Sequence, residues 1–227
     1  GGFSNSSAGA TAVTVTHGVT LAADDVAVVL INVNNQPTIS DNNGASPFTQ
    51  QREDNCNGTS GRCAIWFRRL SGSEGTTFDF TLGSLQRWAI IGAVYRGVAA
   101  SGTIWDVVPN ANLFAATTTP VATDITTLTD GAYAWADCSV DSATVTFSAW
   151  PSGFSSIADE LDQSCNVSDK SISPTGTVSA GWTISASTPG TSHLGALLPA
   201  AGGAAGHPTM RRWDHVQYMT LNRGIWS

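Results

Sequence analysis

Apolar and polar residues alternate with a period of two along most of the chain, which is the pattern of half-buried β-strands. In residues 76–82 (TTFDFTL), the two Phe and the Leu share one face, and the residues between them share the other. Residues 26–33 are instead almost continuously apolar, and residues 89–94 repeat this pattern. Such apolar runs predict central strands that are buried on both faces.

Ten segments have this strand character, and turns rich in Asn, Asp, Gly and Pro separate them. They are residues 11–16, 25–34, 63–70, 76–82, 88–96, 121–128, 131–138, 143–150, 177–186 and 192–199. This series predicts an all-β protein in which two antiparallel sheets form a sandwich, in jelly-roll order. One short helix is predicted at residues 156–163, where Ser156 can cap the first turn and Ile157 and Leu161 share a face.

The composition changes at both ends of the strand pattern. We predict an N-terminal arm at residues 1–10, one β-sandwich domain at residues 11–200, an Ala/Gly linker at residues 201–206 and a C-terminal tail at residues 207–227. A sandwich of this length commonly forms a single domain.

Charged residues are scarce, at 12% of the chain against 41% hydrophobic residues, and the formal net charge is −7. The polar surface must therefore consist mainly of Thr, Ser, Asn and Gly, as in many extracellular and particle-forming proteins. An acidic balance disfavours nucleic acid and an anionic membrane surface as partners, because both attract clustered Lys and Arg. No apolar run approaches the ~18 residues of a membrane-spanning helix. These features predict a virion-surface or extracellular location.

The chain has four cysteines, Cys56, Cys63, Cys138 and Cys165. An even number in an acidic, Lys-poor chain favours disulfides over a zinc site, which normally shows closely spaced cysteine pairs. Three pairings are possible. Because the turn-rich loop between Cys56 and Cys63 can close on itself, we predict the disulfides Cys56–Cys63 and Cys138–Cys165.

No catalytic, cofactor or metal motif is found. The acidic residues Asp159, Glu160 and Asp162 fit the helix dipole of the predicted helix better than a glycosidase pair. The four His residues lack metal-ligand spacing, and no serine-nucleophile elbow or phosphate-binding loop is present. Residues 41–44 (DNNG) fit a hairpin turn better than a Ca²⁺ loop. We therefore predict a protein without enzymatic activity, cofactor or metal.

The tail is the candidate docking element, because it is rich in residue types that dominate protein interfaces. The candidate docking residues are Arg211, Arg212, Trp213, Tyr218, Met219, Leu221, Ile225 and Trp226. In water, the apolar members of this set would form an exposed patch that soluble monomers avoid. We predict that the tail docks on a neighbouring subunit or another protein. The alternative is that it adds a strand to its own sandwich.

Four stretches resemble β-sandwich structural proteins of tailed-bacteriophage virions. They are residues 16–34 (THGVTLAADDVAVVLINVN), 64–75 (AIWFRRLSGSEG), 88–98 (WAIIGAVYRGV) and 190–197 (GTSHLGAL). The resemblance covers roughly residues 11–200 and implies a capsid decoration, spike, fibre or tail part. Such a protein assembles as a homo-oligomer and with other virion proteins, and the resemblance implies no catalytic residues.

Two other functions remain open. The eight Trp residues offer aromatic surfaces for sugar rings, so a secreted carbohydrate-binding, lectin-like module is the main alternative, with a host-surface glycan as its ligand. A sandwich-fold lyase or hydrolase is the third hypothesis, and no motif supports it.

Overall fold

The computed structural model describes residues 2–161, 163–201 and 209–211, and within these ranges it is all-β, without helices. The strands are β1 (Gly2–Thr16), β2 (Ala23–Asn34), β3 (Ile39–Asp41), β4 (Thr49–Asn55), β5 (Gly61–Ser71), β6 (Thr77–Arg96), β7 (Trp105–Thr117), β8 (Ile125–Thr126), β9 (Ala132–Val140), β10 (Phe147–Ala149), β11 (Ser155–Glu160), β12 (Cys165–Ile172), β13 (Thr177–Val178), β14 (Thr183–Ile184), β15 (Thr188–Leu197) and β16 (Thr209–Arg211). The predicted all-β class is confirmed.

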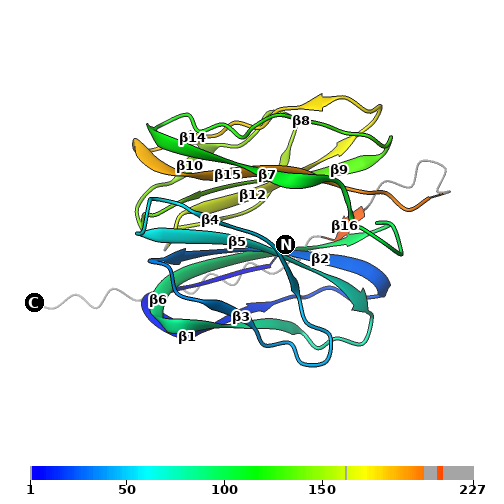
Figure 1. Cartoon of the computed structure of the whole chain (residues 1–227), viewed down its shortest axis with the longest axis horizontal. Coiled ribbons are helices and arrows are strands. Elements are labelled where there is room, and N and C mark those ends of the chain that lie inside the picture. Colours follow the sequence, from blue (N-terminus) through cyan, green and yellow to red (C-terminus); the bar gives the residue numbers. More distant parts are fainter. Residues whose placement is uncertain (1, 162, 202–208, 212–227) are drawn as a thin grey trace, which may run out of the picture.

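Two main antiparallel sheets face each other (Figure 1). The first has the order β1-β6-β2-β5-β4, with β3 and β16 also paired to β6, and the second has the order β11-β12-β9-β15-β7. Two small ribbons, β10–β14 and β8–β13, complete the described strands. Neither main sheet closes on itself, and this strand order does not establish the predicted jelly-roll connectivity.

Strand β2 is central to the first sheet, as its apolar sequence predicts. It pairs with β5 on one side and β6 on the other, and residues 25–33 are all buried. Alternate side chains enter different cores: Leu30 packs between the two sheets, whereas Val29 and Ile31 pack on the outer face of the first sheet. The continuous apolar run therefore serves two cores at once.

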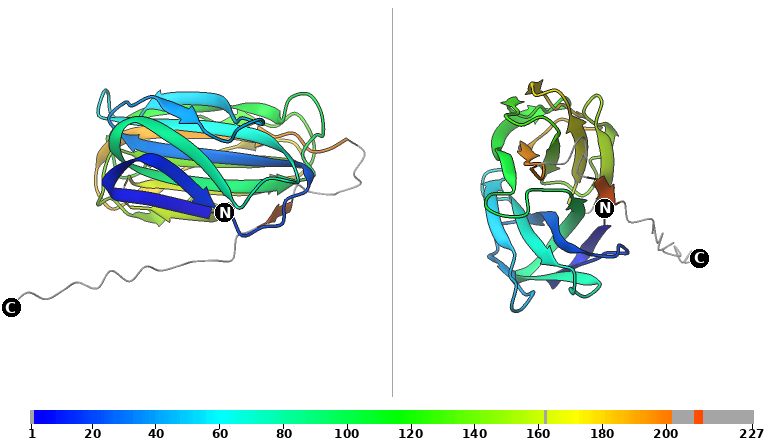
Figure 2. Two further views of the ribbon diagram at one scale, coloured as in Figure 1. Left: turned by 90° about the horizontal axis from the view of Figure 1, so that it is seen from below. Right: turned by 90° about the vertical axis from the view of Figure 1, so that its right-hand side faces the viewer.

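The outer core of the first sheet is enclosed by the sheet's own curvature. The first part of β6 pairs with the second half of β1 and with β3, whereas its last part pairs with β2. Figure 2 shows β1 and β6 curving across the sheet. Phe78, Phe80 and Leu82 are buried in this core, which confirms the alternation predicted for residues 76–82.

The second sheet is covered on its outer face by the two small ribbons and their connections (Figure 1). Ala134 and Ala136 of β9 and Leu194 of β15 pack there against Trp182 and neighbouring apolar side chains. Both main sheets are thus buried on both faces in their central strands, which explains why so many of their residues are apolar or small.

Polar contacts join the two sheets along both open sides. On one side, Arg52 of β4 donates from Nη1 to the carbonyl oxygen of Pro109 in β7, at 3.4 Å. On the other side, Asn5 of β1 donates to the Glu160 carboxylate of β11. The β4–β7 side is the more elaborate of the two and contains the cluster described below.

The helix predicted at residues 156–163 is wrong, because β11 is an extended strand that pairs with β12. The Asn166 carboxamide of β12 donates to Ser156 Oγ at 3.0 Å and also to Asp159. A helix this short is marginal by itself, and the paired edge of β12 supplies partners that an isolated helical turn lacks. Asp162 lies outside the described residues.

The first and the last described strands, β1 and β16, lie on one edge of β6. Strand β1 begins at Gly2, opposite Gly92, and residues 2–6 and 10, which belong to the predicted N-terminal arm, pair with β6. Strand β16 continues along the same edge, with Arg211 opposite Val94. The remaining candidate docking residues, Arg212, Trp213, Tyr218, Met219, Leu221, Ile225 and Trp226, lie outside the described residues.

Candidate functional site

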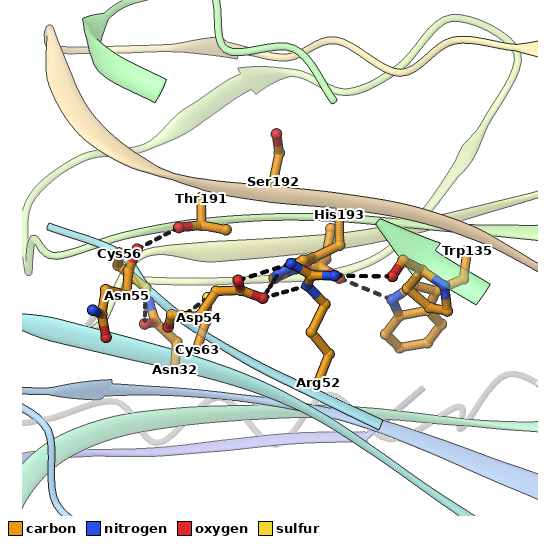
Figure 3. A network of polar contacts seen from close by, with 12 residues as sticks. Asn32, Arg52, Asp54, Asn55, Cys56, Cys63, Trp135, Thr191, Ser192 and His193 are labelled. Carbon is orange, nitrogen blue, oxygen red and sulfur yellow. Dashed lines mark hydrogen bonds and ion pairs between the residues drawn. The ribbon is translucent and has the colours of Figure 1, made fainter. Parts of the chain in front are cut away.

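The most concentrated polar chemistry in the described structure surrounds His193, in the space between the two sheets (Figure 3). His193 lies on β15 directly opposite Asp137 of β9, and its Nδ1 is 2.7 Å from Asp137 Oδ1. Its Nε2 is 3.1 Å from Oδ2 of Asp54, which reaches across from β4 of the other sheet. The imidazole therefore joins a carboxylate of each sheet.

Each carboxylate has a second partner. The Arg52 guanidinium binds Asp54 with two N–H groups, one of them Nη2 at 2.9 Å from Oδ1. Trp135 Nε1 donates to Asp137 Oδ2 at 3.0 Å. The result is a line of hydrogen bonds and ion pairs that runs from the partly exposed Arg52 into the centre of the sandwich.

The charges favour a protonated imidazole. Burial by itself lowers the pKa of His193, but the negative charge of Asp137, with Cys63 and the hydrogen bonds to Asp137 and Asp54, raises it well above 6.5. An imidazolium between two carboxylates, with one guanidinium beside them, gives His193, Asp137, Asp54 and Arg52 a net charge of zero. Such compensation is what a buried charge requires.

Cys63 of β5 adds a thiol to the cluster. Burial raises its pKa, but a hydrogen bond from the Cys56 thiol and the positive charge of His193 lower it to about 7. Cys56 Sγ also lies 3.3 Å from Asn32 Oδ1. The Asn32 carboxamide nitrogen lies 3.2–3.3 Å from three carbonyl oxygens of the second sheet and its loop, those of Val140, Gln163 and Ser164.

The residue types match those of nucleophilic catalysis, in which a thiol acts with a His that a carboxylate orients. A catalytic group must also be accessible to a substrate, and Cys63, Asp137 and His193 all have an exposed fraction of 0%. Thr191 closes the neighbouring part of the seam by donating to the Asn55 carbonyl at 2.6 Å. In this structure the cluster links β4 and β5 of one sheet to β9 and β15 of the other.

The predicted disulfides are wrong, because all four cysteines are free and buried. Cys165 lies opposite Ser139 in the ladder, so its side chain points between the sheets, whereas Cys138 packs in the outer core of the second sheet. Side chains on opposite faces of a sheet cannot be bridged.

Cys56 and Cys63 share a face, but they are diagonal rather than directly opposite neighbours, because Asp54 is the residue opposite Cys63. The Cα atoms of diagonal neighbours in a sheet are about 7–8 Å apart. An unstrained disulfide needs Cα atoms closer than about 7 Å.

We expect thiol titration to distinguish four free cysteines from a protein that contains a disulfide. With an aromatic disulfide reagent, the folded protein should show no rapidly reacting thiol, because all four are buried. In denaturant without reductant, all four should react. Titration of only two thiols, or of none, in denaturant would show that a disulfide exists after all.

The other sequence-predicted features lie elsewhere. Asp159 and Glu160 are at the opposite side of the sandwich from His193, on β11, and accept hydrogen bonds from Asn166 and Asn5. In residues 41–44, Asp41 accepts hydrogen bonds from Asn43 and from the Phe48 backbone, as a turn requires. No group of His, Cys, Asp and Glu in the described part of the chain has the arrangement of a metal site.

Sequence reasoning missed the His193 cluster, apart from the two cysteines that it assigned to a disulfide. The available signal was a polar residue inside an apolar strand, Asp137 in AYAWADC and His193 in SHLGALL. A buried polar group needs a partner, so two such strands indicate a pair.

Comparison of the chain with models of known protein families, with curated proteins and with solved structures finds no match. Within the described residues, no helix is long and apolar enough to cross a membrane.

Proposed function

We propose that this protein is a virion structural protein, a surface or tail component of a tailed bacteriophage that acts by protein–protein assembly. The observation that supports this proposal best is that the centre of the His193 cluster is closed to solvent. Cys63, Asp137 and His193, the side chains that could take part in catalysis, have an exposed fraction of 0%. The cluster joins the two sheets, so its role is to hold the sandwich together. A rigid, chemically inert body suits a particle component.

The segments that carry the resemblance to phage β-sandwich proteins belong to the interior of the fold. The four stretches contribute to β2, β5, β6 and β15, which are interior strands of the two main sheets. They form the framework of the fold, so a likeness there concerns the architecture rather than a site. On this proposal the protein is located at the virion surface, and its partners are further copies of itself and other virion proteins.

One observation favours carbohydrate binding as a second candidate. Among the six Trp residues that the structure describes, only Trp150 is substantially exposed, at 45%. An exposed indole can stack on a sugar ring. Binding of the wild-type protein on a glycan array, lost in Trp150→Ala, would support a lectin-like function.

Sizing and electron microscopy of the purified full chain test the assembly function, and two truncations test the role of the tail in it. We expect the full chain to form closed rings or a lattice at high concentration. Truncation after Arg211 keeps β16 and removes the other candidate docking residues, so it should abolish these assemblies and leave the melting temperature unchanged.

Truncation after Gly206 is the matched control, because it also removes β16 and its pairing with β6. It should lower the melting temperature as well. A protein that ends at Arg211, keeps its assemblies and melts much lower would show that the tail belongs to its own fold. A full chain that forms no assembly and binds a glycan through Trp150 would rule out the virion function.

A further inference from the structure

Two asparagines of the chain precede a glycine, Asn43 before Gly44 and Asn57 before Gly58. In such a pair the backbone nitrogen of the glycine can attack the side-chain carbonyl carbon of the asparagine, because glycine has no side chain to obstruct the approach. The attack releases ammonia and forms a cyclic imide, which water then opens to aspartate or isoaspartate. Both pairs have the same dipeptide, so a difference in their reactivity must come from the fold.

The two glycines are alike, and the side chain of Asn43 is held in place. Gly44 and Gly58 are both exposed, with φ angles of +69° and +56°, and both would have open space around a Cβ. Asn43 Nδ2 donates to Asp41 Oδ1 at 2.6 Å and to the Asp79 carbonyl oxygen at 2.8 Å. Its Oδ1 accepts from the Asp79 backbone nitrogen at 3.0 Å. Turning this carboxamide towards Gly44 breaks these bonds, and the loss of even one slows a reaction about tenfold.

Asn57 is held less firmly. It is exposed and begins the turn between β4 and β5, where the Ser60 backbone nitrogen donates to its carbonyl oxygen at 2.9 Å. Its side chain lies beside Asp141, the residue after β9. Burial raises the pKa of Asp141, and a hydrogen bond from Asn57 and the positive charge of Arg87 oppose this rise. The Asn57 carboxamide is therefore open to water and has less to lose by turning towards Gly58.

We propose that Asn57 is a site of spontaneous deamidation, and that the reaction places a second carboxylate against Asp141. The turn packs closely there, since a Cβ at Gly61 would lie 3.0 Å from the Asp141 Cβ. The change removes a hydrogen-bond donor and adds a like charge, and Arg87 can neutralise only one of the two carboxylates. The turn joins β4 to β5 at the end of the His193 cluster that contains both cysteines of these strands, so deamidation weakens this end of the sandwich (Figure 3).

The site is tested by incubating the folded full chain at physiological temperature and mildly alkaline pH, with peptide mass spectrometry at intervals. The mass increase that accompanies replacement of an amide NH2 by OH should appear at Asn57 at least about tenfold faster than at Asn43. In denaturant the two positions should react at similar rates, because the fold no longer distinguishes them. Equal rates in the folded protein, or reaction at Asn57 only after denaturation, would overturn the proposal.

Asn57→Asp measures the consequence of the new charge. We expect it to melt lower than the wild type at about pH 7, and the difference to shrink towards about pH 4, where carboxylates become protonated and the repulsion is lost. The charged and titratable groups that face Asp141 are Arg87 and Cys56. Neither changes its charge in this range, since Arg87 stays protonated and burial raises the pKa of Cys56 well above 9.0.

Asn57→Gln is the matched control. It keeps the carboxamide, but its attack on the next backbone nitrogen would form a larger ring and is much slower. This variant should melt like the wild type when fresh and keep that melting temperature during the incubation, whereas the wild type should drift towards Asn57→Asp. An Asn57→Asp protein that melts like the wild type, or lower by the same amount at every pH, would show that no second carboxylate acts on Asp141.

Discussion

Replacing His193 by Ala should lower the free energy of unfolding by about 3–5 kcal/mol, the cost of removing one partner from a buried ion pair. The substitution leaves Asp137 without its partner at 2.7 Å and Asp54 without its contact to the second sheet. Arg52 still neutralises Asp54, so the larger part of the loss should come from Asp137, which is fully buried. Urea denaturation followed by tryptophan fluorescence measures the effect.

Glu53→Ala is the matched control. Glu53 precedes Asp54 on β4 and pairs with Arg62 at 3.2 Å, but about a third of its side chain is exposed. This pair is partly exposed and lies outside the His193 cluster, so its loss should cost much less, close to the ~0–1 kcal/mol of surface pairs. Similar losses in the two variants would mean that the His193 cluster does not hold the sheets together.

A double-mutant cycle adds a second check. Asp137→Ala combined with His193→Ala should cost less than the sum of the two single changes, because the double variant leaves no unpaired imidazolium or Asp137 carboxylate behind. Additive losses would indicate that the two residues stabilise the protein independently, in spite of the 2.7 Å contact.

The fold could be predicted from the sequence wherever burial alone decides the pattern. Residues 26–33 had to be a central strand because no single-faced strand is apolar at successive positions. The alternation of Phe78, Phe80 and Leu82 likewise fixed which face is buried. Residues 156–163 were mistaken for a helix because Ile157 and Leu161 fit helical spacing, while the deciding partner, Asn166, belongs to another strand.

The His193 cluster could not be predicted, because its residues meet only through sheet packing. Asp137 is 56 positions from His193 in the sequence, and Asp54 is 139 positions away. Cysteine spacing misled for the same reason. Cys138 and Cys165 lie on neighbouring strands, but the face on which each side chain points depends on strand register, which the spacing does not encode.

The stability of the protein should also depend on pH through His193. Its pKa is raised in the folded state, so its stabilising contribution is fully present below the ordinary value of 6.5 and is lost as the pH rises through the raised pKa. The groups that face it are Arg52 and Asp54 of β4, Cys63 of β5 and Asp137 of β9. Of these groups, Cys63 changes the stability in the opposite direction to His193 as the pH rises.

The pKa of Cys63 is lowered from 9.0 to about 7, so its contribution is present above pH 9.0 and is lost as the pH falls through about 7. In the wild type the two contributions therefore partly cancel between neutral pH and pH 9.0. Cys63→Ser removes the thiol with little change in size. In that background we expect the free energy of unfolding to fall above pH 6.5, by up to about 1.4 kcal/mol per pH unit for one proton.

The comparison that isolates His193 is Cys63→Ser against Cys63→Ser/His193→Gln. Glutamine can still donate a hydrogen bond but does not titrate, so the double variant should be less stable at pH 6 and show the flatter dependence between pH 6.5 and pH 9.0. Burial raises the pKa values of Cys56, Cys138 and Cys165 well above 9.0, so these thiols lower the stability of both variants alike at higher pH. Urea denaturation over a series of pH values gives both curves. If the two curves run parallel, the imidazole is not protonated in the folded protein, and His193 does not form ion pairs with Asp54 and Asp137.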